Sequence, residues 1–578
     1  MFLRRCARRK DGKNHSYWAL VESYRTVKGS RQRVVAYLGD LRKGQLSGWS
    51  HLGRRMAKGE RPQPELFDPP HYNEQGEEEW VEVDLKGVRF ERVRDFGDVW
   101  LAWGLWRMLA LDDKLTELMA QGREDVPWPV VAAVLVIGRF CAPSSELWIE
   151  DCWYGRTALE DLLGVRPEQI HTNRLYAGLD RLLVHKEAIE THLKRRLGDL
   201  FDLDYDLLVY DVTSTYFEGE AQANLMAKRG YSRDHRSDRP QVCIGLVVTT
   251  DGMPVGYEVF EGNRNDSTTV ESIVEVMERR YGKARRVWVL DRGMVSEDNL
   301  RFIRGKGASY IVGTPKPMLR QFEKDLTGMD WKEVEPGVEV KLVAGPDSHE
   351  RFILARSADR REKEKAIHER CCDRMEDGLR KLQVAAESGR LKESSVAHQR
   401  LGRLRERYWR ANGAFEVSIR QLDCGRGRQR LEITWVRNRG WEEWALMSQG
   451  CYLLRTNLKE MDPAKLWRQY VQLTDAEWAF RIAKDELQIR PIWHQTSERV
   501  RGHILVCFLA YCMWKALGGW MKAARLGEAP RTLLDEFAKI KSGDVVLPVR
   551  SSDGQCGKTV RLRCVTMPDK AQKVLLNR

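Results

Sequence analysis

The chain has 578 residues and a formal net charge of +13. This length exceeds that of one average domain, so several domains are expected. The positive charge favours polyanionic partners such as nucleic acid, although an anionic membrane surface would attract the chain as well. The longest apolar runs, 130–137 and 504–514, are shorter than the roughly 18 residues that a bilayer span needs. Because the start also lacks a signal-peptide pattern, we expect a cytoplasmic protein with no membrane partner.

The cysteines give no sign of a disulfide framework or of a structural zinc site. Twelve cysteines are spread over the chain without a CxxC pair, so reduced thiols are expected. A structural zinc site needs four soft ligands at recognisable spacing. Cys556 and Cys564 are the only close pair near the C-terminus, and no histidine follows them. The cysteines therefore predict no zinc site.

Residues 1–65 are predicted to form a basic region that contacts DNA. Cationic clusters alternate there with aromatic residues: Arg4-Arg5, Arg8-Arg9-Lys10, Arg31, Arg33, Arg42-Lys43 and Arg54-Arg55, with Tyr17, Trp18, Tyr24 and Tyr37. Such cations bind phosphates, but a solvated basic face is the commoner explanation of a charge run. Pro62 and Pro64, followed by the acidic residues 77–79, predict a linker and a boundary near residue 65.

Residues 66–200 are predicted to be mainly helical. Apolar residues recur at steps of three and four from Val99 to Leu109, and Thr172-Asn173 can cap the helix that follows. The tryptophans of this region are most simply explained as core residues. A DNA-reading helix is an alternative here, although no helix-turn-helix signal stands out.

Residues 201–317 alternate strands and helices. In chain order we expect strands ending at Asp211 and covering 242–249 and 255–260, a helix from Ser267 to Tyr281, a strand at 286–290, a helix at 296–303 and a strand at 310–312. Asp251-Gly252 is a strong hairpin turn between the second and third strands. This order predicts an α/β fold with the mixed sheet of a ribonuclease-H-like core.

An insertion domain is predicted to interrupt this core at 318–450. It should contain strands at 338–343, 351–355, 415–419 and 431–436 and a charged helical hairpin within 360–412. The second part of the core then covers 451–525 and carries a helix with Glu477. A C-terminal region, 526–578, follows it.

Three carboxylates stand where a two-metal site would need them. Asp211 ends the apolar run 207–210, Asp291 ends the run 287–290, and Glu477 lies in a helical segment. Neighbouring strands are expected to bring Asp211 and Asp291 close together. Mg²⁺ prefers oxygen ligands, and two ions about 4 Å apart can activate the attacking oxygen and stabilise the leaving oxygen. The set therefore predicts phosphodiester chemistry.

Each acid also has an ordinary structural explanation. A strand-end aspartate commonly caps the next turn, and Thr474 with Glu477 fits a capping box at a helix start. Four further acids are alternative ligands on sequence alone: Asp204, Asp206, Asp475 and Glu486. The metal site is favoured because Asp211, Asp291 and Glu477 together coincide with the positions that the core requires.

Helical spacing places Glu477, Arg481 and Lys484 on one face. A carboxylate for a metal and two cations for phosphate would then share one surface. The rival explanation is an exposed ion pair between Glu477 and Arg481, which would contribute about 0.3 kcal/mol.

The region 470–484 resembles the Y-x2-R-x3-E-x6-K signature of DDE-type insertion-sequence transposases. Tyr470, Glu477 and Lys484 match this signature, whereas Leu473 occupies the position of its arginine. Arg468 and Arg481 are candidates to replace that arginine. Further segments are similar to the acidic motifs and to the same branch of the family, namely 210–217, 290–294, 230–236 and the basic start.

The resemblance implies a DNA transposase that binds the terminal inverted repeats of its element, cleaves the ends and joins the 3′-hydroxyls to target DNA. Asp211, Asp291 and Glu477 would hold two Mg²⁺ ions, for which Mn²⁺ can substitute. Tyr470, Lys484 and Arg481 would contact DNA near the scissile phosphate. The active complex would contain a homodimer, associated with the nucleoid.

Two other functions remain open. A ribonuclease-H-like nuclease would use the same metal site without strand transfer. A transposase-derived DNA-binding protein would have lost catalysis, although the intact set of acids argues against it. A phosphate-binding GxxxxGK[ST] loop is absent from the sequence, so an ATP-driven motor is not expected.

Overall fold

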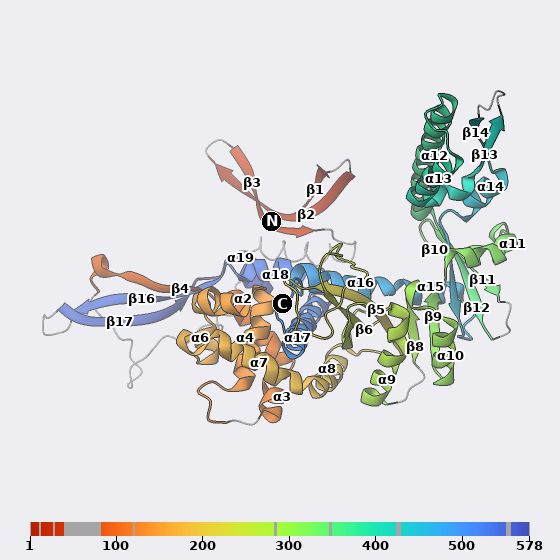
Figure 1. The fold of residues 1–578 in the computed structure, drawn as a ribbon. Coiled ribbons are helices and arrows are strands. Elements are labelled where there is room, and N and C mark those ends of the chain that lie inside the picture. The colour runs from red at the N-terminus through yellow and green to blue at the C-terminus, as the bar shows by residue number, and fades with distance from the viewer. Residues whose placement is uncertain are drawn as a thin grey trace. The chain divides into compact units, whose positions relative to one another are not determined.

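The computed structural model describes residues 2–10, 13–26, 29–39, 83–119, 122–282, 286–345, 349–423, 429–550 and 556–576 (Figure 1). The chain divides into two compact units. Unit 1 comprises residues 1–205, 210–283 and 474–578, and unit 2 comprises residues 206–209 and 284–473. The chain therefore leaves unit 1, builds most of unit 2 and returns to unit 1.

The largest sheet has nine strands in the order β10-β11-β12-β15-β9-β8-β5-β6-β7. Its core strands are β5 (Leu207–Tyr216), β6 (Gln241–Thr249), β7 (Pro254–Glu261), β8 (Val287–Leu290), β9 (Ser309–Gly313) and β15 (Cys451–Thr456). β6 and β7 pair antiparallel, whereas β8 and β9 pair parallel. Two helices connect these strands, α9 (Val270–Tyr281) and α10 (Glu297–Gly305). The predicted fold class, an α/β ribonuclease-H-like core with a mixed sheet, is confirmed.

The hairpin and the first strand follow from local sequence. Gly252 has a φ of +70°, which glycine adopts without strain, and its amide donates to the carbonyl of Thr249 at 2.9 Å. The predicted turn between β6 and β7 is therefore confirmed. β5 is longer than predicted, because the β-branched residues Val212, Thr213 and Thr215 continue the strand beyond Asp211. Asp211 thus lies in the middle of a strand and not at its end.

Within unit 1, helices cover most of the described part of the region that the sequence predicts to be helical. It contains α2 (Gly97–Met108), α3 (Leu111–Leu118), α4 (Trp128–Cys141), α5 (Glu146–Trp148), α6 (Leu159–Leu163), α7 (Thr172–Val184) and α8 (Lys186–Phe201). Residues 131–140 of α4 are all buried, because α4 packs against α2, α7 and α17. The ring of His171, one residue before the expected cap, accepts the capping hydrogen bond of α7.

Helix α17 (Ser497–Ala523) is the long apolar helix of unit 1. It is long and apolar enough to cross a membrane, but 78% of its most apolar window is buried within the structure. It packs against α4, α7 and β7, as the central helix of a folded core does. The helix is longer than the apolar run 504–514 because the polar residues His503 and Lys515, which end that run, are also helical.

The N-terminal segment forms a separate antiparallel sheet in the order β1-β2-β3. The strands are β1 (Phe2–Lys10), β2 (Lys13–Thr26) and β3 (Gly29–Gly39). Arg4 and Arg5 are exposed on β1. The predicted linker and the boundary near residue 65 lie outside the described residues.

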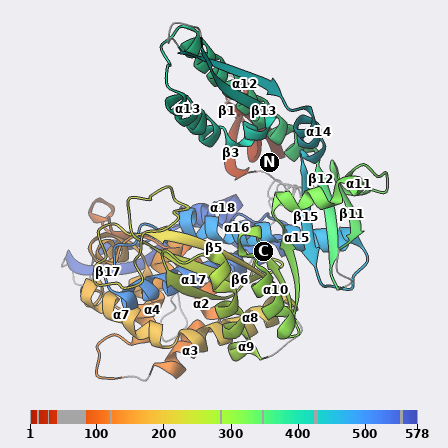
Figure 2. The same ribbon diagram turned by 45° about the vertical axis from the view of Figure 1, so that its right-hand side comes forward.

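Part of the predicted insertion belongs to the main sheet of unit 2. Strands β10 (Lys332–Glu335), β11 (Val338–Ala344) and β12 (Arg351–Ser357) extend it, because β12 pairs antiparallel with β15. The rest folds around a core of its own that includes Met375, Leu379 and Leu431. Figure 1 and Figure 2 show its elements together, with β14 labelled in Figure 1: α12 (Ala358–Glu387), α13 (Ser394–Arg407), β13 (Phe415–Asp423), β14 (Gln429–Arg437) and α14 (Arg439–Ser448).

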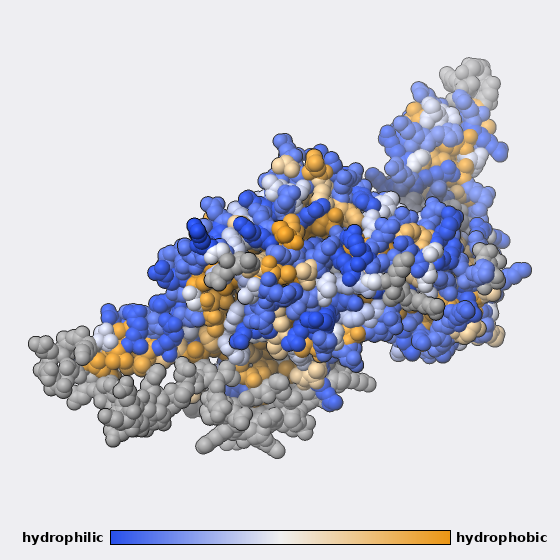
Figure 3. All heavy atoms as spheres, turned by 90° about the horizontal axis from the view of Figure 1, so that it is seen from below, coloured by the Kyte–Doolittle hydropathy of each residue, from blue (hydrophilic) through white to orange (hydrophobic). Residues whose placement is uncertain are grey.

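The C-terminal region pairs with a strand from far earlier in the sequence. β16 (Lys541–Arg550) lies between β17 (Cys556–Val565) and β4 (Arg89–Asp95). The helices α18 (Pro530–Phe537) and α19 (Lys570–Leu576) flank these strands in sequence. Hydrophobic residues are visible along this sheet in Figure 3, and Phe90 and Val93 are 74% and 65% exposed.

Candidate active site

Asp211 projects from the buried strand β5 in unit 1. Its neighbours Tyr210 and Val212 are buried, whereas Asp211 itself is partly exposed. The amide of Val212 donates to Oδ1 of Asp211 at 2.7 Å. Burial would lower the pKa of Arg233, but Asp266 and the nearby charge of Asp211 raise it overall. A permanent cation therefore lies close to Asp211.

Glu477 lies on the exposed face of α16 (Leu473–Arg481), also in unit 1. Leu473, Ala476 and Ala479 on the opposite face are buried. Helix α16 begins at Leu473, so Thr474 lies inside the first turn and not at the position of the expected capping box. The carboxylate of Glu477 is thus presented on the solvent side of its helix.

Arg481, one turn after Glu477, is exposed as well. Its guanidinium lies 5.1 Å from the ring centroid of Trp478, and this tryptophan is 57% exposed. A cation held over an exposed aromatic ring is a surface that can contact both phosphates and bases. The guanidinium of Arg481 is therefore accessible to solvent over an exposed aromatic ring.

The surroundings of Lys484 differ from the exposed helix face that the sequence predicts. It lies on a π-helical turn, η9 (Ile482–Glu486), which follows the last α-helical residue and changes the spacing from Glu477. Its Nζ donates to Oδ1 of Asp234 at 2.8 Å, and the side chains of Lys484 and Asp234 are 10% and 2% exposed. Burial lowers the pKa of Lys484, although Asp234 opposes this shift. Lys484 is therefore a mostly buried ion-pair partner and not an open surface cation.

Asp234 connects two motifs that the sequence presented separately. It also accepts a hydrogen bond from Arg490, which in turn contacts Asp485 at 3.1 Å. Asp234 lies within the segment 230–236, whose resemblance to transposases was apparent, but its role as the anion between two cations was not. The resemblance of that segment was the only signal that could have drawn attention to it.

Asp291 lies in unit 2, directly after β8. The side chain of Asp291 is exposed and makes no capping hydrogen bond to the turn that follows it. The capping explanation of this aspartate is therefore wrong. Burial raises the pKa of Tyr470, and the negative charge of Asp291 raises it further. Tyr470 thus lies near Asp291 and keeps its phenolic hydrogen.

Two of the four alternative acids are engaged elsewhere in unit 1. Glu486 forms an ion pair with Arg531 at 3.0 Å. Burial raises the pKa of Asp475, and the charge of Lys515 on α17 opposes this shift. Asp204 and Asp206 are exposed in the loop before β5, where the carbonyl of Asp206 accepts from the amide of Val287 at 2.7 Å.

Leu473, which stands at the arginine position of the signature, belongs to the core. Leu473 is 6% exposed, so its side chain faces the interior and not a DNA surface. Arg468 on α15 (Pro463–Val471) and Arg481 on α16 are both exposed. Either of them can present a guanidinium to DNA in place of the arginine.

The donor set suits a hard divalent cation. Asp211, Asp291 and Glu477 supply only carboxylate oxygens, and each of them is at least partly accessible to solvent. Mg²⁺ and Mn²⁺ prefer oxygen ligands and keep positions for water and phosphate. Asp211 and Glu477 belong to unit 1, whereas Asp291 and Tyr470 belong to unit 2.

Comparison with family models identifies the chain. Residues 202–513 match the transposase DDE domain, more than half of the sequence. The chain belongs to the DDE transposase family. Residues 3–67 match the N-terminal domain of IS1634 family transposases, which supports an insertion-sequence transposase. The matched segment of the DDE domain includes all three acids of the candidate site.

Other comparisons add little to this assignment of the transposase. The search of curated proteins finds no match. Among solved structures, the cryo-EM structure of the piggyBac transposase synaptic complex with hairpin DNA is similar over 78% of this chain and 82% of that chain, at 7% identity and a TM-score of 0.35. A similarity at this level does not bear on the site or the mechanism.

Proposed function

We propose that this transposase cleaves DNA at the terminal inverted repeats of its element and joins the freed 3′-hydroxyls to target DNA. The observation that carries the proposal is the position of the three acids within the matched DDE domain. Asp211 lies on the first strand of the ribonuclease-H-like core, Asp291 directly follows β8, and Glu477 lies on the exposed face of α16. A structural role alone does not require accessible carboxylates on all three elements.

Asp211, Asp291 and Glu477 would hold two Mg²⁺ ions, with Mn²⁺ as a substitute. When bound, such ions activate the attacking oxygen and stabilise the leaving oxygen of the phosphodiester. Each carboxylate is carried by, or directly follows, a strand or helix of its own unit. The phenol of Tyr470, protonated next to Asp291, can donate a hydrogen bond to a phosphate oxygen.

The transposase signature is completed by Tyr470, Glu477 and Lys484, with Leu473 in place of the arginine. We assign the missing DNA contact to Arg481, because its guanidinium is exposed one helical turn from Glu477 and lies over Trp478. Lys484, which pairs with Asp234, holds the turn that follows the helix of Glu477. The active complex is a homodimer that brings two DNA ends together.

Strand transfer is the measurement that tests the proposal. Purified protein, a labelled end of the element and a supercoiled target plasmid are incubated with Mg²⁺, and covalent joining of the 3′-end to the plasmid is expected. Cleavage without joining would identify a nuclease instead. Binding with neither reaction would identify a DNA-binding protein that has lost catalysis.

The N-terminal region is expected to supply much of the affinity for the ends. Deleting residues 1–61 should flatten the dependence of affinity on salt, because each phosphate contact adds about 0.9 to the slope of log K against log salt. The match of residues 3–67 to a transposase N-terminal domain supports this assignment. Affinity is measured at several salt concentrations for the full chain and for the chain that lacks residues 1–61. An unchanged slope would make the region a solvated basic face.

A further inference from the structure

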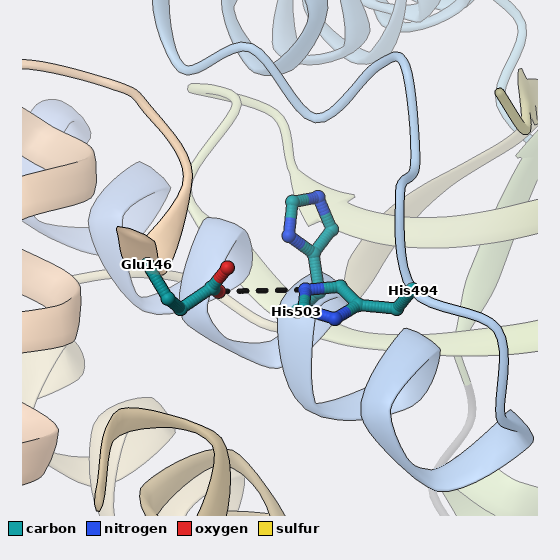
Figure 4. Close-up of side chains that lie close together, drawn as sticks. All are labelled: Glu146, His494 and His503. Atoms are coloured by element: carbon teal, nitrogen blue, oxygen red, sulfur yellow. Dashed lines mark ion pairs between the residues drawn. The ribbon is translucent and has the colours of Figure 1, made fainter. Parts of the chain in front are cut away.

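Three ionisable side chains meet inside unit 1. Glu146 begins α5, His503 lies on α17, and His494 lies in the segment between η9 and α17 (Figure 4). Their exposed fractions are 5%, 5% and 8%, and one ligand atom from each lies within 4.8 Å of the other two. The spacing of the cysteines was the only sequence signal used to predict zinc, and it does not include these three residues.

The hydrogen bonds of the cluster leave lone pairs for a ligand. Nε2 of His503 lies 3.2 Å from the carbonyl oxygen of Ile489. Because a carbonyl only accepts, Nε2 carries the hydrogen and Nδ1 of the neutral ring keeps its lone pair. Histidines that bind metals usually donate their other N–H in this way. Nε2 of His494 lies 3.4 Å from Oε1 of Glu146, the contact drawn in Figure 4.

The charge states also suit a cation. Burial alone would raise the pKa of Glu146, but His494 outweighs it and lowers the pKa to about 2. Burial lowers the pKa of His503 to about 3, and the charge of Arg139 adds to this shift. The cluster therefore contains a carboxylate and a neutral imidazole. The carboxylate offsets the positive charge of Arg139, which faces the cluster from α4.

We propose that Glu146, His494 and His503 bind one divalent transition-metal ion, with Zn²⁺ as the representative. Two imidazoles and one carboxylate form a ligand set that zinc accepts, with a remaining position for water. Bonds of about 2.0–2.1 Å place tetrahedral donors roughly 3.4 Å apart. Glu146 and His494 are already at 3.4 Å, so His503 needs to move inward by less than about 1.5 Å.

The bound ion would connect two parts of unit 1 that lie far apart in sequence. Glu146 belongs to the helical region, whereas His494 and His503 follow η9, which carries Lys484. The ion would therefore fix the segment after Lys484 against the helical region. This role is structural and separate from the oxygen-ligand site of Asp211, Asp291 and Glu477.

The test uses the full chain, freed of metal by EDTA and titrated with Zn²⁺ in an excess of Mg²⁺. The Mg²⁺ occupies carboxylate sites, so the remaining zinc binding reports imidazole and thiolate ligands, which the variants below distinguish. We expect one zinc ion per chain and a loss of affinity of at least about 100-fold in His494→Gln and in Glu146→Gln. The control His192→Gln, whose ring also bonds a backbone carbonyl, at Leu109, should bind zinc like the wild type.

Two results would overturn the proposal. If the wild-type protein takes up no zinc under these conditions, the cluster is only a buried ion pair. The same conclusion follows if His494→Gln binds zinc as tightly as the wild type. Co²⁺ substitution keeps the test decisive if a variant fails to fold. Wild-type protein with Co²⁺ should show the visible absorption of a four-coordinate site with nitrogen ligands, and its absence would reject the site.

Discussion

Replacing Asp291 with asparagine should reduce cleavage of the DNA ends by at least about 100-fold, the scale on which loss of a group that stabilises developing charge acts. The amide is a poor ligand for a hard cation, so the metal site would lose one of its three carboxylates. DNA affinity should not change, because phosphate contacts come from the basic surfaces. Nicking and gel-shift assays on one end sequence measure the two properties.

The structure supplies a matched control for this substitution. Asp298 on α10 is 82% exposed at its side chain and pairs with Arg301 at 3.0 Å. Asp298→Asn makes the same chemical change in unit 2 and should leave cleavage at the wild-type rate. Asp291→Asn should also keep the wild-type unfolding temperature, since its side chain makes no capping hydrogen bond. If Asp291→Asn cleaves the ends as fast as Asp298→Asn, Asp291 is not part of the catalytic site.

Asp234→Ala should destabilise the protein by about 3–5 kcal/mol, because it leaves two cations without their shared anion. Asp234 is 2% exposed at its side chain and holds both Lys484 and Arg490. Lys484→Met should cost much less, since the pair of Asp234 and Arg490 remains and the methionine fills the volume of the lysine stem. Denaturant unfolding of both variants measures this asymmetry.

The same variants separate the structural and DNA-binding roles of Lys484. If Lys484 contributes a charge-assisted contact to the cleaved end, Lys484→Met should weaken end affinity by about 1–3 kcal/mol. Arg301→Gln, which removes an exposed arginine on α10, is the control for the loss of one positive charge. Equal unfolding energies for Asp234→Ala and wild type would show that the network does not stabilise unit 1. Stability loss in Lys484→Met with unchanged end affinity would make this lysine purely structural.

Local sequence determined the elements of this transposase and the candidates for its site. The alternation of apolar runs and turn residues predicted β6, β7 and α9, because hydrophobic periodicity and glycine turns act over a few residues. The three acids could be selected for the same reason, as each stands beside a recognisable element. The signature residues Tyr470, Glu477 and Lys484 added the family.

Only the tertiary structure decided which distant residues meet. Asp234 and Lys484 are 250 positions apart, and no local pattern reports an ion pair over that separation. The same holds for the pairing of β4 with β16, for the addition of β10–β12 to the main sheet, and for the cluster of Glu146, His494 and His503. Burial against distant segments selects these contacts, because desolvated charges need partners wherever the chain brings them.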